Sequence, residues 1–338
     1  MPVIRHLPPG SFAPVMATGI VSIAAHAFDD PWIVRTLFRL NQALYAVLWL
    51  LTLVRCLAYP TRVKADLGNP KAAPGFLTIV AGTCLLGSQY VLFEQDYGLG
   101  WWLWLAGLGL WGLLLYAVFT ALILAAQPTR LACIDGSWLL TVVATQSVAV
   151  LGVLLAPTLP EHRVLVLFAA LCLYLLGCVL YLLITALIVG RLLLVPLTAR
   201  DWVPSYWINM GAAAITVLAG STLASHASLV PWLEVLIPFL KGCAVLFWAV
   251  ATWWIPLILI LGFWRYVCQN FPIRYELAYW SVVFPLGMYS AGTHQLAKTM
   301  DIAILHPLAR VFFSASLSAW LVVFIGLLRT ILALGRAR

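Results

Sequence analysis

Charge is scarce in this sequence of 338 residues: Asp, Glu, Lys and Arg together make up 9% of the chain, whereas hydrophobic residues make up 64%. Soluble globular domains contain roughly 25% charged residues, so the composition excludes an ordinary soluble protein. The mean hydropathy is +1.03, and the apolar runs approach the roughly 20 residues that an α-helix needs to cross the hydrocarbon core. The sequence therefore predicts an all-α membrane protein with many spans.

Motifs for metal binding, redox chemistry and catalysis are also lacking. The seven cysteines form no CxxC pair and show no Cys/His ligand spacing, so we expect no disulfide framework, no metal site and no cofactor. No nucleophile motif or phosphate-binding loop indicates an enzyme. The net charge of +8 lies in the short connections between apolar runs, where it reports membrane topology. We therefore expect no nucleic-acid partner.

Charged residues and clusters of Pro and Gly bound ten apolar runs, which we interpret as transmembrane helices. They cover residues 11–28, 38–58, 75–93, 101–126, 137–156, 164–195, 204–224, 233–266, 277–297 and 308–334. Ten spans place both termini on one side of the membrane. Of the 19 Lys and Arg residues, 13 lie on that side and 6 on the other. This excess predicts cytoplasmic N- and C-termini in the cytoplasmic (inner) cell membrane.

The spans repeat in pairs. The odd-numbered spans begin near residues 11, 75, 137, 204 and 277, and each start combines small residues or Pro with an aromatic residue. We interpret the chain as one transmembrane domain of five helical hairpins, at 11–58, 75–126, 137–195, 204–266 and 277–334. Each hairpin returns to its starting side, so all five share one orientation and are related by an axis along the membrane normal. Five such hairpins can close into a ring.

Uncharged polar residues distinguish the two helices of each hairpin. Over cores of comparable length, the odd spans hold 23 Ser, Thr, Asn, Gln or His residues and the even spans 7, and no core contains a charged residue. Polar side chains are costly in hydrocarbon unless they face protein or water. The pattern predicts odd helices around a central pore and even helices against lipid. Hydrogen bonding between helices is the alternative for any single Ser or Thr.

A pore without carboxylates disfavours cations, since cation pathways commonly carry rings of Asp or Glu, and helix N-termini at its cytoplasmic end favour anions. We expect kinks at Pro14 and Pro285. Beside Pro285, the ring of Phe284 either occludes the path as a hydrophobic gate or simply packs in the core. The pore-lining candidates are Thr18, Ser22, Thr83, Thr145, Asn209, Thr216 and Ser281.

Histidines gather at the outer ends of the helices. His26, His226 and His294 end three odd spans on one side. Three interpretations remain open: ordinary interfacial side chains, a pH-sensitive outer mouth, or ligands of haem in a membrane haem or quinone oxidoreductase. The last is the alternative from another functional class, and a Soret absorption band would identify it.

Three odd spans carry motifs that resemble a known family. They are SFAPVMATGI at 11–20, PSYWINMGA at 204–212 and YWSVVFPLGM at 279–288. These motifs are similar to those of the tellurite-resistance/C4-dicarboxylate transporter family, which includes plant slow anion channels, fungal malate permeases and sulfite efflux pumps. The resemblance implies a homotrimer in which each protomer has its own five-hairpin pore, lined by the odd helices and occluded at Phe284.

The expected function is therefore transport of a small anion across the lipid bilayer rather than catalysis. A C4-dicarboxylate such as malate is the first candidate substrate. Sulfite, tellurite, and chloride or nitrate are alternatives within the same family. The sequence leaves open whether transport is coupled to protons and in which direction it runs.

Overall fold

The computed structural model describes residues 2–125 and 131–336, and within these ranges the chain folds into helices and connections without strands. Eight helical segments of the described chain are long and apolar enough to cross a membrane. This confirms the all-helical, multi-pass membrane class predicted from the composition. The helices at the first and ninth expected spans are outside these eight: the first has 14 residues and the ninth carries Gln295 and Lys298.

Five helices lie in the interior and are called the inner helices. They are α2 (Ala13–His26), α5 (Thr78–Gln89), α7 (Leu140–Leu155), α9 (Ile208–Ser225) and α12 (Trp280–Met300). A short 3₁₀ turn precedes each: η1 (Pro9–Phe12), η2 (Ala73–Leu77), η5 (Gly136–Leu139), η7 (Pro204–Trp207) and η10 (Leu277–Tyr279). Each inner helix contacts the next one along the chain, and α12 contacts α2. The contacts therefore close into a ring.

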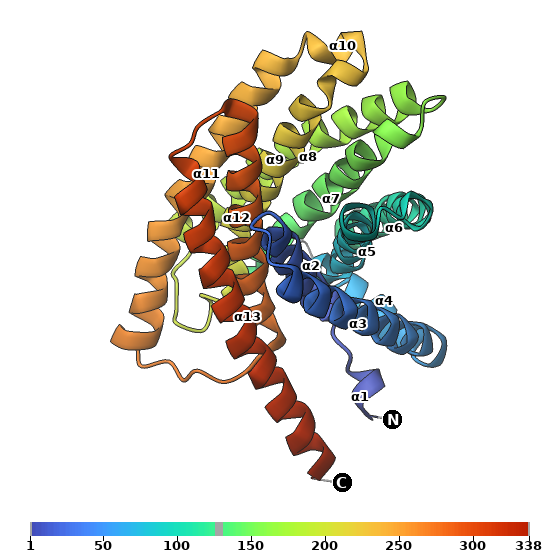
Figure 1. Ribbon diagram of the computed structural model, residues 1–338. Helices are drawn as coiled ribbons and strands as arrows, with labels where there is room; N and C mark the ends of the chain where they lie inside the picture. Colours follow the sequence, from blue (N-terminus) through green and yellow to red (C-terminus); the bar gives the residue numbers. More distant parts are fainter. Residues whose placement is uncertain (1, 126–130, 337–338) are drawn as a thin grey trace.

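Five longer helices, the outer helices, each pack against the inner helix that precedes them (Figure 1). They are α3 (Pro31–Ala58), α6 (Tyr97–Ile123), α8 (Arg163–Leu194), α11 (Ile237–Phe263) and α13 (Leu305–Arg336). In their most apolar stretches, 17–44% of the outer-helix residues are buried, against 83–94% for the segments containing α5, α7 and α9. The outer helices expose mainly apolar side chains, as contact with hydrocarbon requires.

Short elements connect the long helices. They are α1 (Pro2–Arg5), α4 (Pro60–Leu67), α10 (Pro231–Glu234), the 3₁₀ turns η4 (Leu131–Cys133), η6 (Ala156–Thr158) and η8 (Ala227–Leu229), and the π-helical turns η3 (Tyr90–Glu94) and η9 (Trp264–Cys268). The last residue of the fourth expected span, 126, lies outside the described residues.

Two outer helices, α3 and α6, begin at least four residues earlier than the sequence predicts. The expected start of α3 near residue 38 is wrong, because Asp30 caps the helix by accepting a hydrogen bond from the backbone N–H of Ile33 (3.4 Å) and Pro31 fits the first turn. In the same way Asp96 caps α6, which starts at 97 rather than 101. In both helices, the capping carboxylate lies several residues before the apolar run, so the helix begins before the run does.

Hydrogen bonds between aromatic residues and threonines join four of the five outer helices, all except α8, to the inner helix of the following hairpin. Trp320 of α13 donates to Thr18 (2.9 Å), Tyr45 of α3 lies 3.0 Å from Thr83, Trp111 of α6 donates to Thr145 (2.8 Å), and Trp248 of α11 donates to Thr293 (3.0 Å). At the corresponding place on α9, Thr216 accepts from the amide of Gln146 (3.3 Å). These bonds fix the rotation of the inner helices.

Candidate functional site

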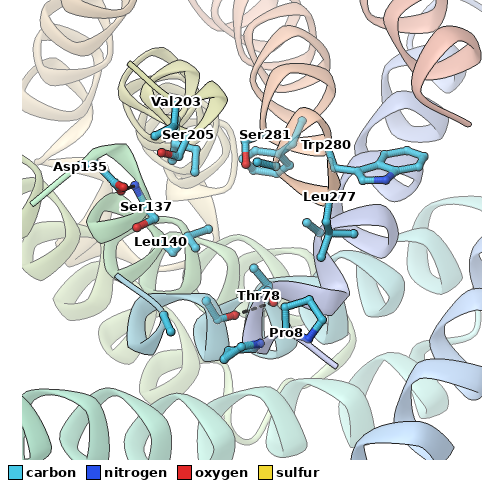
Figure 2. A pocket seen from close by; sticks show the side chains of 18 of the residues that line it. Pro8, Thr78, Asp135, Ser137, Leu140, Val203, Ser205, Leu277, Trp280 and Ser281 are labelled. Atoms are coloured by element: carbon cyan, nitrogen blue, oxygen red, sulfur yellow. Dashed lines mark hydrogen bonds between the residues drawn. The ribbon is translucent and has the colours of Figure 1, made fainter. Parts of the chain in front are cut away.

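A cavity of about 400 Å³ lies where the N-terminal ends of the inner helices converge (Figure 2). Every inner helix or its 3₁₀ turn contributes to the wall, so the cavity lies on the axis of the ring rather than between two neighbouring helices. Its lining includes Gly10, Ala13, Met16, Lys71, Gly75, Thr78, Asp135, Ser137, Leu140, Ser205, Ile208, Ser281 and Phe284.

Glycines allow the helix starts to approach one another closely. A Cβ added at Gly136 would lie 2.0 Å from the carbonyl oxygen of Ser205, and one added at Gly75 would lie 2.7 Å from the backbone nitrogen of Gly10. Neither position has room for a larger residue. The backbone contact at Gly136 places the first residues of η5 directly beside those of η7.

The helix starts give the cavity a positive potential. The turns η1, η2, η7 and η10 have no side-chain cap, so no side chain accepts from their first N–H groups. At the remaining turn, η5, Asp135 accepts a hydrogen bond from the backbone N–H of Ser137 (2.7 Å). Helix N-termini carry partial positive charge and bind anions through their N–H groups. Five converging starts therefore favour a negatively charged ligand.

Two charged side chains, Lys71 and Asp135, line the cavity, and neither is among the residues predicted from the sequence. Burial raises the pKa of the Asp135 carboxyl, while hydrogen bonding by Ser137 and the charge of Lys71 act in the opposite direction. Asp135 was missed because it precedes the expected span by two residues. Its signal was a carboxylate directly before the Gly-Ser pair that starts a helix.

Two of the predicted residues, Ser281 and Phe284, line the cavity. Phe284 lies one turn deeper along α12 than Ser281, and it is 3% exposed. Met16 lies at the corresponding depth of α2, one turn beyond Ala13. These two large apolar side chains are the deepest lining residues on their helices.

The other pore-lining candidates lie outside this cavity. The hydroxyls of Thr18, Thr83, Thr145 and Thr216 make the interhelical bonds described above. The amide of Gln89 donates to the hydroxyl of Ser22, and the side-chain amide of Asn209 donates to the carbonyl of Tyr206 (2.8 Å). Their predicted place along the rest of the path stays a prediction.

The two candidate prolines occupy different positions in their helices. Pro14 lies in the first turn of α2, where its missing N–H breaks no helical hydrogen bond. Pro285 lies inside α12, and a Cβ at Gly211 of α9 would lie 2.8 Å from its Cγ. Only Pro285 thus removes a hydrogen bond from a helix interior; the kinks expected at Pro14 and Pro285 stay predictions.

The candidate histidines have separate neighbours. The ring of His26 lies 5.1 Å from that of Phe93, and the ring of His294 lies 5.3 Å from that of His306. His226 makes a 2.9 Å hydrogen bond to the carbonyl of Thr222. Across residues 2–125 and 131–336, no three His, Cys, Asp or Glu side chains are grouped as metal ligands. The outer-mouth and haem interpretations are not tested by these contacts.

Comparison with known proteins assigns the chain to a family. A relative from Mycobacterium tuberculosis, an uncharacterized membrane protein, is 38% identical over 159 residues, which is 47% of this chain and 80% of the relative. An uncharacterized transporter of Methanocaldococcus jannaschii is 23% identical over 95% of this chain and 94% of its own. A sulfite efflux pump of Arthroderma otae is 23% identical over 95% of this chain and 90% of its own.

The family model described as voltage-dependent anion channel matches residues 6–328, nearly the whole chain. This match and the transporter relatives support a membrane anion transporter and agree with the resemblance found in the three motifs. The chain belongs to the voltage-dependent anion channel family.

Proposed function

We propose that the protein moves small anions along the axis of the inner helices, with the cavity as the entry site on the cytoplasmic side. The convergence of five helix N-termini on one cavity carries this proposal, because their partial positive charges act on the same volume. The hydroxyls of Ser137, Ser205 and Ser281 add hydrogen-bond donors, and the carboxylate of Asp135 offsets the charge of Lys71 in the lining. Such a site attracts an anion without trapping it, as conduction requires.

The proposed membrane arrangement is ten spans in five hairpins, with the inner helices around the path and the outer helices against lipid. In this proposal the protein lies in the cytoplasmic (inner) cell membrane with both termini in the cytoplasm. The orientation follows from the Lys and Arg residues, because 13 of the 19 fall on the side of the termini. A homotrimer with one path per protomer is the proposed assembly, on the basis of the family resemblance.

Phe284 is the proposed gate. Its ring lines the deep end of the cavity, next to a helix-interior proline. An apolar ring in a narrow path excludes water and hydrated ions until it moves aside. Packing of the ring against the inner helices keeps the path closed in this proposal.

A C4-dicarboxylate such as malate is the first proposed substrate. Sulfite is the second candidate, favoured by the relatives named as sulfite efflux pumps. Tellurite, chloride and nitrate are the remaining alternatives. Malate, sulfite and chloride differ in size and charge, so they should inhibit the flux of a single reference anion to different extents.

Anion flux in proteoliposomes tests both gate and substrate. Phe284→Ala removes the occluding ring, and we expect flux to rise about tenfold or more, since a barrier lower by about 1.4 kcal/mol has that effect. Phe168→Ala, which truncates a half-exposed ring on α8, is the matched control and should match the unaltered protein. Adding each candidate anion in excess then ranks the substrates by competition.

The gate proposal fails if Phe284→Ala leaves the flux of every tested anion unchanged. Clear preference for cations would contradict the proposed function itself. A Soret band in the spectrum of the purified protein would favour the haem oxidoreductase instead.

A further inference from the structure

One of the five helix starts already holds a carboxylate. Asp135 is the N-cap of η5, and its Oδ1 accepts from the backbone N–H of Ser137 at 2.7 Å. The other four starts have no side-chain cap. At the start of α7, therefore, the carboxylate of Asp135 occupies the backbone N–H of Ser137, a donor that a transported anion would otherwise use.

Two serine hydroxyls lie beside this carboxylate. Ser137 and Ser205 both line the cavity, on the neighbouring turns η5 and η7 (Figure 2). Among the described residues, neither hydroxyl oxygen has a hydrogen-bond partner, yet both hydroxyls lie close enough to the Asp135 carboxyl to lower its pKa. Ser205 is 8% exposed. The backbone contact at Gly136 holds the two turns together. The carboxyl and both hydroxyls therefore belong to one site of fixed shape.

Two titratable groups lie close enough to Asp135 to interact with its charge: Lys71 from the connection before η2 and Tyr206 of η7. Arg191 of α8 and Asp201 from the connection before η7 lie close to Tyr206, and Cys133 of η4 precedes Asp135 by two positions in the sequence. Asp201 lies 3.7 Å from Arg191, and hydrogen bonding by Thr198 together with Arg191 holds the pKa of Asp201 below its ordinary value. Arg191 and Asp201 thus offset each other outside the cavity lining. Within the lining, Asp135 and Lys71 determine the charge.

We propose that Asp135 is a built-in competitor for anions at the cavity, and that its protonation opens the start of α7 to the transported anion. When ionised, the carboxylate occupies the N–H of Ser137, attracts the two hydroxyls and neutralises Lys71. When protonated, it releases these donors and leaves Lys71 as a net positive charge in the lining. The proposal rests on the proposed function, because it names the regulation of the same cavity.

The direction of the pH dependence follows from the carboxyl group. Its burial raises the pKa, so protonation begins at a less acidic pH than for a carboxyl in water. Flux should therefore rise as the pH falls. Even when water screens the interaction fully, removing one charge about 4 Å from a bound anion changes anion occupancy by about fivefold.

Chloride flux into proteoliposomes at two pH values tests the inference, because chloride itself does not titrate in this range. The pH is set equal inside and outside, at about 5.5 and at about 8, so that no proton gradient contributes. We expect the unaltered protein to be about fivefold faster at the lower pH. Asp135→Asn, which keeps the shape but not the charge, should be fast at both.

Glu276→Gln is the matched control. Glu276 also immediately precedes a 3₁₀ turn, η10, but it is exposed and does not line the cavity. This variant should keep the full pH ratio of the unaltered protein. A second variant, Ser205→Ala, removes one donor and should lower flux about threefold at the acidic pH only.

The outcomes separate the two proposals. Absence of flux of every candidate anion, both in the unaltered protein and in Phe284→Ala, would overturn the proposed function. If chloride flux occurs and Asp135→Asn keeps the same ratio of flux at low pH to flux at high pH, the role of Asp135 alone is overturned. An Asp135→Asn protein that elutes normally but carries chloride slowly at both pH values has the same meaning. If Asp135→Asn does not yield folded protein, an unchanged pH ratio in Ser205→Ala overturns the inference.

Discussion

Gly136 shows how a single residue determines the geometry of the cavity. It lies between Asp135 and Ser137, and its Cα faces the backbone of Ser205 and Tyr206 without an intervening side chain. Because the groups it faces are main-chain atoms in helix starts, they cannot rotate away as a flexible side chain can. The positions of Asp135 and Ser205 in the cavity wall both depend on this contact.

Substitution of Gly136 by Ala should destabilise the protein by about 1–3 kcal/mol, because a methyl group would overlap the backbone of η7. Thermal unfolding of the detergent-solubilised protein measures the effect. The control is Gly112→Ala on α6, where an added Cβ meets nothing within 4 Å and removal of a helix-interior glycine should be neutral or stabilising by up to about 1 kcal/mol. Equal unfolding temperatures for the two variants would contradict the proposed overlap.

At the scale of the elements, hydrogen bonds between polar side chains align outer helices with inner helices. These bonds are specific because the apolar surroundings offer few other hydrogen-bond partners. In α13 and α2, the indole N–H of Trp320 and the hydroxyl of Thr18 meet at 2.9 Å although 302 positions separate them in the sequence. Three more pairs of the same kind join α3, α6 and α11 to the following inner helix. Each bond satisfies a buried threonine hydroxyl and fixes the rotation of one helix against another.

A double-mutant cycle measures this alignment. Trp320→Phe and Thr18→Val each remove one partner, and we expect a coupling of about 0.6–1.7 kcal/mol in the free energy of unfolding, as for other hydrogen bonds between membrane helices. The control cycle combines Thr18→Val with Trp102→Phe, on α6, where the side chain is 68% exposed. The effects of these two substitutions on the free energy of unfolding should be additive. Additivity in the Trp320 cycle would mean that the bond does not align the helices.

At the scale of the whole molecule, the first and last hairpins meet. The ring closes where α12 contacts α2, so its completion depends on both ends of the chain. Both labelled chain ends lie toward the same edge of Figure 1, as expected for an even number of spans.

A protease-protection experiment tests the proposed orientation. A cleavable tag fused to the C-terminus should resist protease added to cells with an intact cytoplasmic membrane and be cut once that membrane is permeabilised, because the excess of Lys and Arg retains this side in the cytoplasm. A tag placed between the eighth and ninth expected spans serves as a matched cytoplasmic site. Cleavage of the C-terminal tag in intact cells would contradict the orientation.

The sequence by itself determined the membrane class, the approximate positions of the long helices and which of them are buried. These properties depend on local composition: charge is absent from the helix cores, and uncharged polar residues concentrate in the helices that become α2, α5, α7, α9 and α12. Motifs within three of these helices also indicated the family, which the match over residues 6–328 confirms.

Only the tertiary structure decided which polar residues face the cavity. The rotation of a helix depends on contacts with partners that are distant in sequence, as the bond between Thr18 and Trp320 shows, so a count of polar residues could not separate interhelical threonines from Ser281. It also could not identify Asp135, because a carboxylate just outside an apolar run has no sequence signature that distinguishes a cavity wall from an exposed connection. Its position arises from the close approach of η5 and η7 at Gly136.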